Sequence, residues 1–242
     1  MLTIHYSLKK MTELTLVRHG QAGATPDNYD ELSALGHQQA RQLGHWLLSH
    51  QREFSALVVG RMRRQRETLA AICEVYAQAG RPLPAVEVLP GLDEYRFVDM
   101  LQIFANNHPE HPELALVRVC PTDRRRWVAL LRTTLAAWSA DTLTGVSESY
   151  AEFQRRTRAA LSEIEVRLTQ GPVLAVSSGG VMGQISQQVL GFDDATFIDV
   201  NLSFMNTSLC EYRLTHSGLK LACLNALPHL AAPELRGMVT AV

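Results

Sequence analysis

The sequence has few cysteines, and they form no pattern. Cys73, Cys120, Cys210 and Cys223 are scattered singly along 242 residues, without C-x-x-C pairs or cysteine–histidine ligand spacing. A structural zinc site needs such spacing, and a disulfide-dependent fold needs a denser set of paired cysteines. The cysteines therefore argue against both.

Long apolar runs are also missing. No stretch approaches the roughly 18 to 20 apolar residues that a membrane-spanning helix needs. Residues 1–10 hold no apolar core long enough for a signal peptide. We expect a cytoplasmic protein that does not bind membranes, with residues 1–12 forming a loose N-terminal extension.

Neither sign of charge is in excess. The 23 lysines and arginines nearly balance the 24 aspartates and glutamates, so the net charge is −1. A nucleic-acid binder usually carries a basic surplus, so we expect no nucleic-acid partner. The arginine-rich segment Arg61–Arg66 is the local exception. Length and composition fit one globular domain over residues 1–242.

Short β-favouring segments alternate with helical ones over the first 90 residues. Ser33 is a suitable N-cap for a helix that continues to Ser49, and Gly80 and Pro82 end a second helix. The expected order is strand 14–17, helix 33–49, strand 56–59, helix 63–79 and strand 86–88. This order predicts an α/β fold with largely parallel pairing.

Residues 95–146 interrupt the alternation. They hold three prolines and one clear helical segment at 122–139, which predicts a helical insertion over one edge of the sheet. The alternation resumes with a helix at 147–169 and a strand at 172–176. The segment 177–180 then opens a helix that continues to about residue 190. Two final strands, 208–214 and 219–224, are expected to pair antiparallel.

Polar residues follow the predicted strands at the edge where ligands bind in α/β sheets. Arg18-His19-Gly20 follows the first strand, Gly60–Arg64 the second, Glu94 the third, and Ser177–Gly180 the strand at 172–176. Two arginines, a histidine, a glutamate and a glycine-rich helix start indicate a phosphate site with a nucleophile and an acid.

Each of these segments also has a plainer interpretation. Arg-His-Gly occurs by chance in loops, Arg61–Arg66 fits a solvated helix face, and most glutamates lie in water. Ser177–Gly180 matches neither the Walker loop nor the dinucleotide-binding motif, and an ordinary helix start explains it. The functional interpretation depends on the four segments occurring together, in order, at one edge of the sheet.

The motifs together resemble those of the histidine phosphatase (phosphoglycerate-mutase-like) superfamily. Arg18-His19-Gly20 is similar to its R-H-G signature, and Leu92-Asp93-Glu94 to its L-x-E acid motif. Three further segments resemble its L-[ST]-x-x-G-x-x-Q-A, S-x-L-x-R-A-x-x-T and E-S-x-x-x-F-x-x-R motifs: Leu32–Ala40, Gly60–Thr68 and Glu148–Arg156. The resemblance implies a three-layer sandwich, with a central mostly parallel sheet between helices.

The resemblance also implies roles for the residues at the strand ends. His19 would be the nucleophile that takes the phosphoryl group, and Glu94 would protonate the leaving oxygen. Arg18 and Arg64 would hold the phosphoryl oxygens through forked hydrogen bonds, helped by Ser178 and Gly179. No cofactor and no metal are implied.

One departure from the family pattern concerns the chemistry directly. The family usually has S-H-G-G where this chain has Ser177-Ser178-Gly179-Gly180, so its second active-site histidine is absent. Serine keeps a hydroxyl donor but cannot carry positive charge. Losing one such donor typically lowers a rate by about 10²–10³-fold.

Smaller departures concern the substrate. Gly60 and Gln65 replace the usual serine and alanine near Arg64, Gln21 replaces a glutamate common in mutases, and Thr25 replaces a frequent asparagine. These changes disfavour phosphoglycerate mutase activity.

The sequence therefore predicts a metal-independent phosphatase that acts on a small phosphomonoester through a phosphohistidine. A degenerate member that only binds a phosphorylated ligand or protein is the alternative, and a mutase is a weaker third. His108 and His111, in the insertion, are either solvent-exposed or a replacement for the missing histidine. The expected partner is a small phosphorylated substrate or phosphate, and a homodimer is left open.

Overall fold

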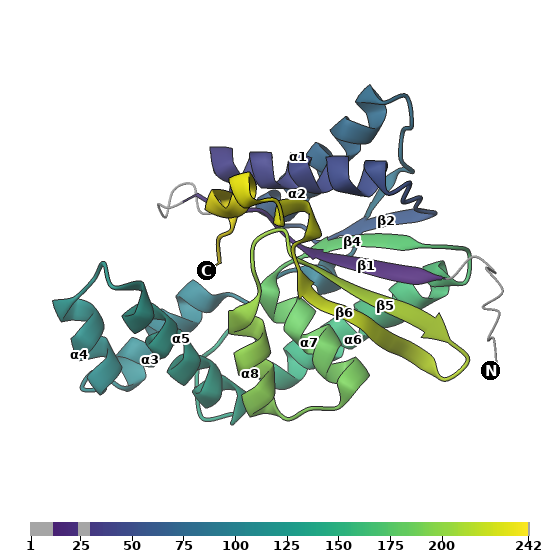
Figure 1. Cartoon of the computed structure of the whole chain (residues 1–242). Helices are drawn as coiled ribbons and strands as arrows, with labels where there is room; N and C mark the ends of the chain where they lie inside the picture. Colours follow the sequence, from purple (N-terminus) through teal and green to yellow (C-terminus); the bar gives the residue numbers. More distant parts are fainter. Residues whose placement is uncertain (1–11, 24–29, 242) are drawn as a thin grey trace, which may run out of the picture.

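The computed structural model describes residues 12–23 and 30–241, and its centre is a six-stranded sheet in the order β3-β2-β4-β1-β5-β6 (Figure 1). The strands β1–β4 pair in parallel, and β5 and β6 add an antiparallel edge. Their bounds are β1 Glu13–Arg18, β2 Ala56–Val59, β3 Val86–Val88, β4 Val173–Ser177, β5 Leu209–Thr215 and β6 Gly218–Ala226. The expected mostly parallel sheet with an antiparallel finish is confirmed.

Helices cover both faces of the sheet, which confirms the three-layer arrangement. One face carries α1 (Ala34–Ser49) and α2 (Arg63–Gln78), and the other carries α6 (Tyr150–Leu168), α7 (Gly179–Leu190) and α8 (Asp194–Ser203) (Figure 1). As predicted, the Ser33 side chain caps α1 by accepting from the amide of Gly36. The expected helix at 147–169 starts later, at Tyr150, because Ser149 and Glu152 form a capping box there.

The central strands are apolar on both sides because both of their faces are buried. Leu16 and Val58 pack with the core under α6 and α7, whereas their neighbours Val17 and Leu57 pack under α1 and α2. This two-residue alternation is the pleat of a strand, and it explains the continuous apolar runs of the sequence.

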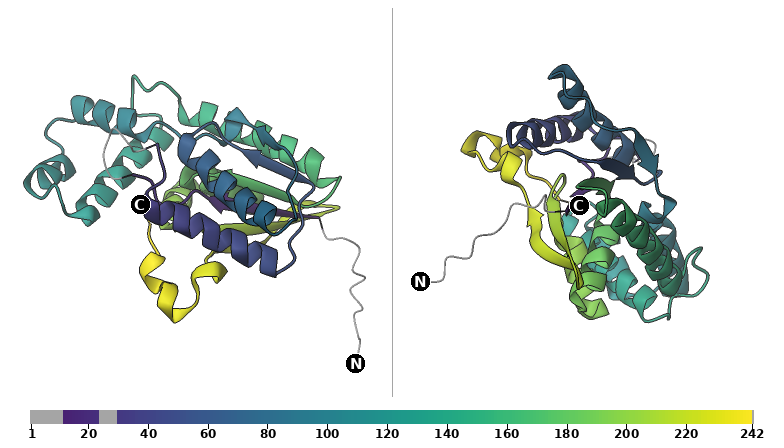
Figure 2. Two further views of the ribbon diagram at one scale, coloured as in Figure 1. Left: turned by 90° about the horizontal axis from the view of Figure 1, so that it is seen from above. Right: turned by 90° about the vertical axis from the view of Figure 1, so that its right-hand side faces the viewer.

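Three helices form the predicted insertion, and only the last had been located from the sequence. They are α3 (Phe97–Asn107), α4 (Pro112–Val119) and α5 (Arg124–Ser139, capped by Asp123). They project beyond the carboxyl ends of the parallel strands (Figures 1 and 2). The insertion therefore lies over the edge of the sheet where the candidate site residues are found.

The expected N-terminal extension lies almost wholly outside the described residues. Among the residues that are described, none of the helices combines the length and apolar character needed to cross a bilayer.

Candidate active site

A narrow cavity at the carboxyl ends of the strands brings together five of the six predicted site residues. Arg18, His19, Arg64, Glu94 and Gly179 line it. Residues from the insertion and from α8 complete its walls, and these are Tyr95, Phe97, Leu131, Asn201 and Leu202. The cavity volume is about 40 Å³, far below the 300–1,000 Å³ of pockets that enclose whole ligands. It suits a compact group such as a phosphoryl oxyanion.

The His19 side chain is held in one orientation and one tautomer. Its Nδ1 lies 2.7 Å from the carbonyl oxygen of Gly20, which can only accept, so Nδ1 carries the hydrogen. The lone pair is therefore on Nε2, which lies 3.1 Å from the Nε of Arg64 and accepts from it. An imidazole in this state presents a nucleophilic nitrogen to the cavity.

The surroundings of His19 also keep the ring neutral. The side chain is buried, and burial together with the Arg64 and Arg18 guanidinium groups holds its pKa well below the usual value. The Gly20 carbonyl opposes this shift only in part. The nucleophilic form consequently persists to a lower pH than for a free histidine.

The two predicted phosphate-binding arginines are buried and line the same cavity as His19. Arg64 also binds the Asp30 carboxylate at 2.9 Å through Nη1. Arg18 ends β1 and donates to the carbonyl of Phe204 at 2.5 Å. A pair of buried guanidinium groups beside one cavity is a strong site for an oxyanion.

The other arginines of the Arg61–Arg66 segment do not enter the cavity. Arg61 binds the Asp93 carboxylate, and Arg63 binds Glu31 and Glu67. Both side chains are exposed, with 66% and 52% of their surface accessible. The solvated-helix interpretation is therefore correct for these two residues, and Arg64 alone faces inward because it lies on the buried side of α2.

Glu94 faces the cavity as a carboxyl group with a raised pKa. Removal from solvent raises it, against the opposing effects of the Gly180 amide and of Arg64. The amide of Gly180 donates to Oε2 at 3.0 Å, and the amide of Tyr95 donates to Oε1 at 3.2 Å. A Cβ on residue 180 would lie 2.3 Å from Oε1, so only glycine allows this close approach. A carboxyl group that keeps its proton to higher pH suits a general acid.

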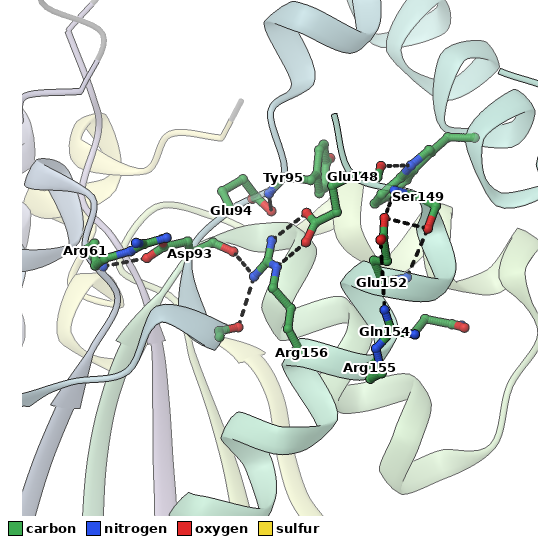
Figure 3. Close-up of polar contacts among 12 residues, drawn as sticks. Arg61, Asp93, Glu94, Tyr95, Glu148, Ser149, Glu152, Gln154, Arg155 and Arg156 are labelled. Carbon is green, nitrogen blue, oxygen red and sulfur yellow. Dashed lines mark hydrogen bonds and ion pairs between the residues drawn. The ribbon is translucent and has the colours of Figure 1, made fainter. Parts of the chain in front are cut away.

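The loop that carries Glu94 is held by Arg156 of α6 (Figure 3). Arg156 donates to the carbonyl oxygens of Gly91 at 3.1 Å and Asp93 at 2.6 Å, and it pairs with both oxygens of Glu148. Arg61 fixes the Asp93 side chain from the other side. Glu148 and Arg156, which the sequence linked only through a motif, thus hold the Glu94 loop from outside the cavity.

Ser178 is not among the residues that line the cavity, although we expected it to bind phosphate. It is fully buried, and its hydroxyl accepts a hydrogen bond of 2.8 Å from Nε2 of Gln65. Its neighbour Gly179 does line the cavity, at the first turn of α7. The next amide along the helix, that of Gly180, donates to Glu94.

Neither insertion histidine replaces the missing one. His111 caps α4 by accepting from the amide of Glu113, and His108 ends α3. Both rings pack against Phe104, and neither lines the cavity. Gln21 is used structurally, since its side chain accepts from the Ser33 hydroxyl, and Thr25 lies outside the described residues.

Several site residues were missed because they belong to segments without a predicted structure. Asn201 of α8 donates to the Tyr95 hydroxyl at 2.9 Å, and both residues line the cavity. Asn206 and the amide of Thr207 both donate to the His19 carbonyl at 3.3 Å. An N-cap signal was present for α8 at Asp193, after the helix stop at Gly191.

Comparison with solved structures shows the same fold in several phosphatases. A phosphoserine phosphatase mutant from Entamoeba histolytica in complex with phosphoserine has a TM-score of 0.61 at 15% identity, over 90% of this chain and 98% of that one. A putative α-ribazole-5′-phosphate phosphatase from Escherichia coli has a TM-score of 0.62 at 19% identity, over 89% and 96%. A mycobacterial glucosyl-3-phosphoglycerate phosphatase has a TM-score of 0.61 at 21% identity, over 88% and 98%.

At the level of sequence, the chain matches a family model but none of the individual curated proteins. A search of the curated proteins finds no match. The model of the histidine phosphatase superfamily (branch 1) matches residues 14–227, which include every motif noted above. The chain belongs to the histidine phosphatase superfamily.

Proposed function

We propose that this protein is a metal-independent phosphatase that hydrolyses a small phosphomonoester through a phosphohistidine on His19. The observation that carries the proposal is the state of His19: Nδ1–H bonds to Gly20, so the lone pair is on Nε2, which accepts from Arg64 in a cavity that Arg18 also lines. The similar structures support it, because all three are of phosphatases.

In the first step, Nε2 of His19 attacks phosphorus and the P–O bond to the alcohol breaks. Arg64 must leave the lone pair for this, and the phosphoryl oxygens are better acceptors for its N–H groups than a neutral nitrogen. Glu94 gives its proton to the leaving oxygen, so the alcohol departs neutral. Arg18, Arg64 and the first turn of α7 at Gly179 hold the charge of the transferred group.

In the second step, water attacks the phosphohistidine. The Glu94 carboxylate takes a proton from this water as the new P–O bond forms and the N–P bond breaks. Inorganic phosphate leaves, and His19 and the protonated Glu94 are regenerated. The two steps balance without a metal or a cofactor.

The direct test is to trap the intermediate. Radiolabelled phosphoester is mixed with the protein and quenched within milliseconds, and the label should appear on His19 in a bond that is stable to base and labile to acid. His19→Ala should take up no label. Labelling without any phosphate release would contradict hydrolysis as the function.

The same experiment separates the two other functions. A member that only binds would retain inorganic phosphate yet give neither label nor product. A mutase would need a bisphosphorylated primer and would move the phosphoryl group within its substrate. We expect phosphate release that does not depend on a primer, because the changes at Gln21 and Gln65 depart from the mutase pattern.

A further inference from the structure

Three departures from the family pattern, far apart in the sequence, meet at one place in the structure. Gln65 of α2 lies between Gly60, at the end of β2, and Ser178, before α7. These are the positions where the family usually has alanine, serine and histidine. All three are buried beside the Glu94 loop.

The orientation of the Gln65 amide is determined by its partners. Its Nε2 donates to the carbonyl oxygen of Leu92 at 3.0 Å and to the hydroxyl of Ser178 at 2.8 Å. A carbonyl cannot donate, so the amide nitrogen must face Leu92, and Ser178 must accept. The Leu92 carbonyl receives a second hydrogen bond, of 2.7 Å, from the Ser177 hydroxyl.

The two hydrogen bonds of the Gln65 amide form a bridge between Leu92 and Ser178, and both of these residues lie close to the proposed catalytic groups. Leu92 is two residues before Glu94, and Ser178 directly precedes Gly179 on the cavity wall. Glu94 in turn accepts from the Gly180 amide, so the acid and the start of α7 are linked twice. The bridge therefore determines how the Glu94 loop sits against the helix that faces the phosphoryl group.

The volume beside residue 178 is already filled. A Cβ on residue 60 would lie 2.1 Å from Oε1 of Gln65 and 2.8 Å from the carbonyl oxygen of Leu92, so glycine at that position lets both groups approach. With Nε2 at 2.8 Å from the serine hydroxyl, no room is left on that side for an imidazole. Gln65 thus occupies the space that a side chain on residue 60 and an imidazole on residue 178 would need.

We propose that Gln65 is a positioning residue: its amide links the Glu94 loop to the start of α7, and it fills the space beside position 178 so that histidine is excluded there. The proposal depends on the proposed function for its effect on rate, because it assigns to Gln65 the placement of the general acid. Its effect on anion binding does not depend on turnover.

The first test uses leaving groups that need the acid to different degrees. Gln65→Met keeps the side-chain length and removes both hydrogen bonds. We expect kcat for an alkyl phosphate to fall by about 10- to 10²-fold, the order of a displaced catalytic group. The fall for 4-nitrophenyl phosphate should be several-fold smaller, because nitrophenolate leaves without a proton.

The matched control is Gln184→Met, which removes another buried glutamine amide, one that bonds to Gln187 within α7. It should lower the melting temperature but leave the ratio of the two rates unchanged. An equal loss on both esters for Gln65→Met would overturn the positioning role, because a merely structural effect does not depend on the leaving group.

The second test restores the family pattern in steps. Ser178→His alone should weaken binding of orthovanadate and lower activity, since the imidazole has to displace Gln65. Adding Gln65→Ala should reverse this, so that the double variant binds vanadate more tightly than Ser178→His by about 10-fold or more. This gain cannot come from a misfolded protein.

Ser178→His that improves binding with Gln65 intact would overturn the proposal, as would a double variant no better than the single one. Vanadate affinity also keeps the two proposals apart. If the wild-type protein hydrolysed neither ester, the proposed function would fail, and the binding comparison would still decide the relation between Gln65 and position 178.

Discussion

The cavity has two walls of opposite character. The wall at the strand ends is charged and holds Arg18, His19, Arg64 and Glu94, whereas the wall from the insertion and α8 includes Phe97, Leu131 and Leu202. In the proposed reaction the charged groups act on the phosphoryl group, which is the same in every phosphomonoester. The apolar side chains can contact only the alcohol part. We infer that the charged wall carries out the reaction and that the apolar wall selects the substrate through its alcohol part.

The largest effect is expected from a substitution of His19, the proposed nucleophile on the charged wall. His19→Ala should lower kcat by about 10⁴- to 10⁶-fold, because none of the other described residues that line the cavity offers an equivalent lone pair to phosphorus. Phosphate binding should persist through Arg18 and Arg64. His216→Ala, in an exposed turn, is the control and should match the wild type in single-turnover assays. Substantial residual turnover in His19→Ala would place the nucleophile elsewhere.

The next effect comes from Glu94. Glu94→Gln should cost about 10²- to 10⁴-fold with an alkyl phosphate, the scale of general acid catalysis. The loss should shrink with 4-nitrophenyl phosphate. An equal loss with both esters would mean that Glu94 does not protonate the leaving group.

The pH dependence of the wild type follows from the same two residues. The pKa of His19 is lowered, so the nucleophile should be lost to protonation only below the usual histidine range. The pKa of Glu94 is raised, so the acid should remain protonated above the usual carboxyl range and then be lost as pH rises. A profile of kcat/KM should thus be displaced towards acid pH, and Glu94→Gln should remove its alkaline limb.

A substitution of Arg64 by lysine shows whether catalysis depends on the geometry of the guanidinium group or only on its charge. Arg64→Lys keeps the charge but loses the forked donors, and kcat/KM should fall by about 10²- to 10³-fold. Arg63→Lys is a matched control one residue away, because that side chain is exposed and pairs with Glu31 and Glu67. Similar rates for the two variants would show that Arg64 does not contact the transferred group.

The smallest expected effect concerns the apolar wall. Phe97→Ala should lower kcat/KM for naphthyl phosphate by about 10-fold, the order of one lost apolar contact, and should hardly change that for glycerol phosphate. Vanadate binding should be unaffected. A uniform loss on both esters would mean that the insertion supports the fold of the site and not the choice of substrate.

The sequence was informative where function depends on local order. Arg18, His19, Arg64 and Glu94 each follow a strand, and parallel strands that start from one side must end on the other. Their meeting at one cavity could therefore be predicted without any contact being known. The individual helices at 97–107, 112–119 and 194–203 (α3, α4 and α8) were not predicted. Their packing partners include elements that are far away in the sequence.

The motifs by themselves determined the family, the order of strands and helices, and which residue types reach the carboxyl edge. These depend on hydrophobic period, on capping residues and on side chains adjacent in the sequence. Only the tertiary structure decided what happens at Ser178. Its partner Gln65 is 113 positions away, and the room for that partner comes from a glycine at position 60. Contacts of this kind depend on how α2 packs against β4, the strand that ends directly before Ser178, and no pattern along the chain encodes them.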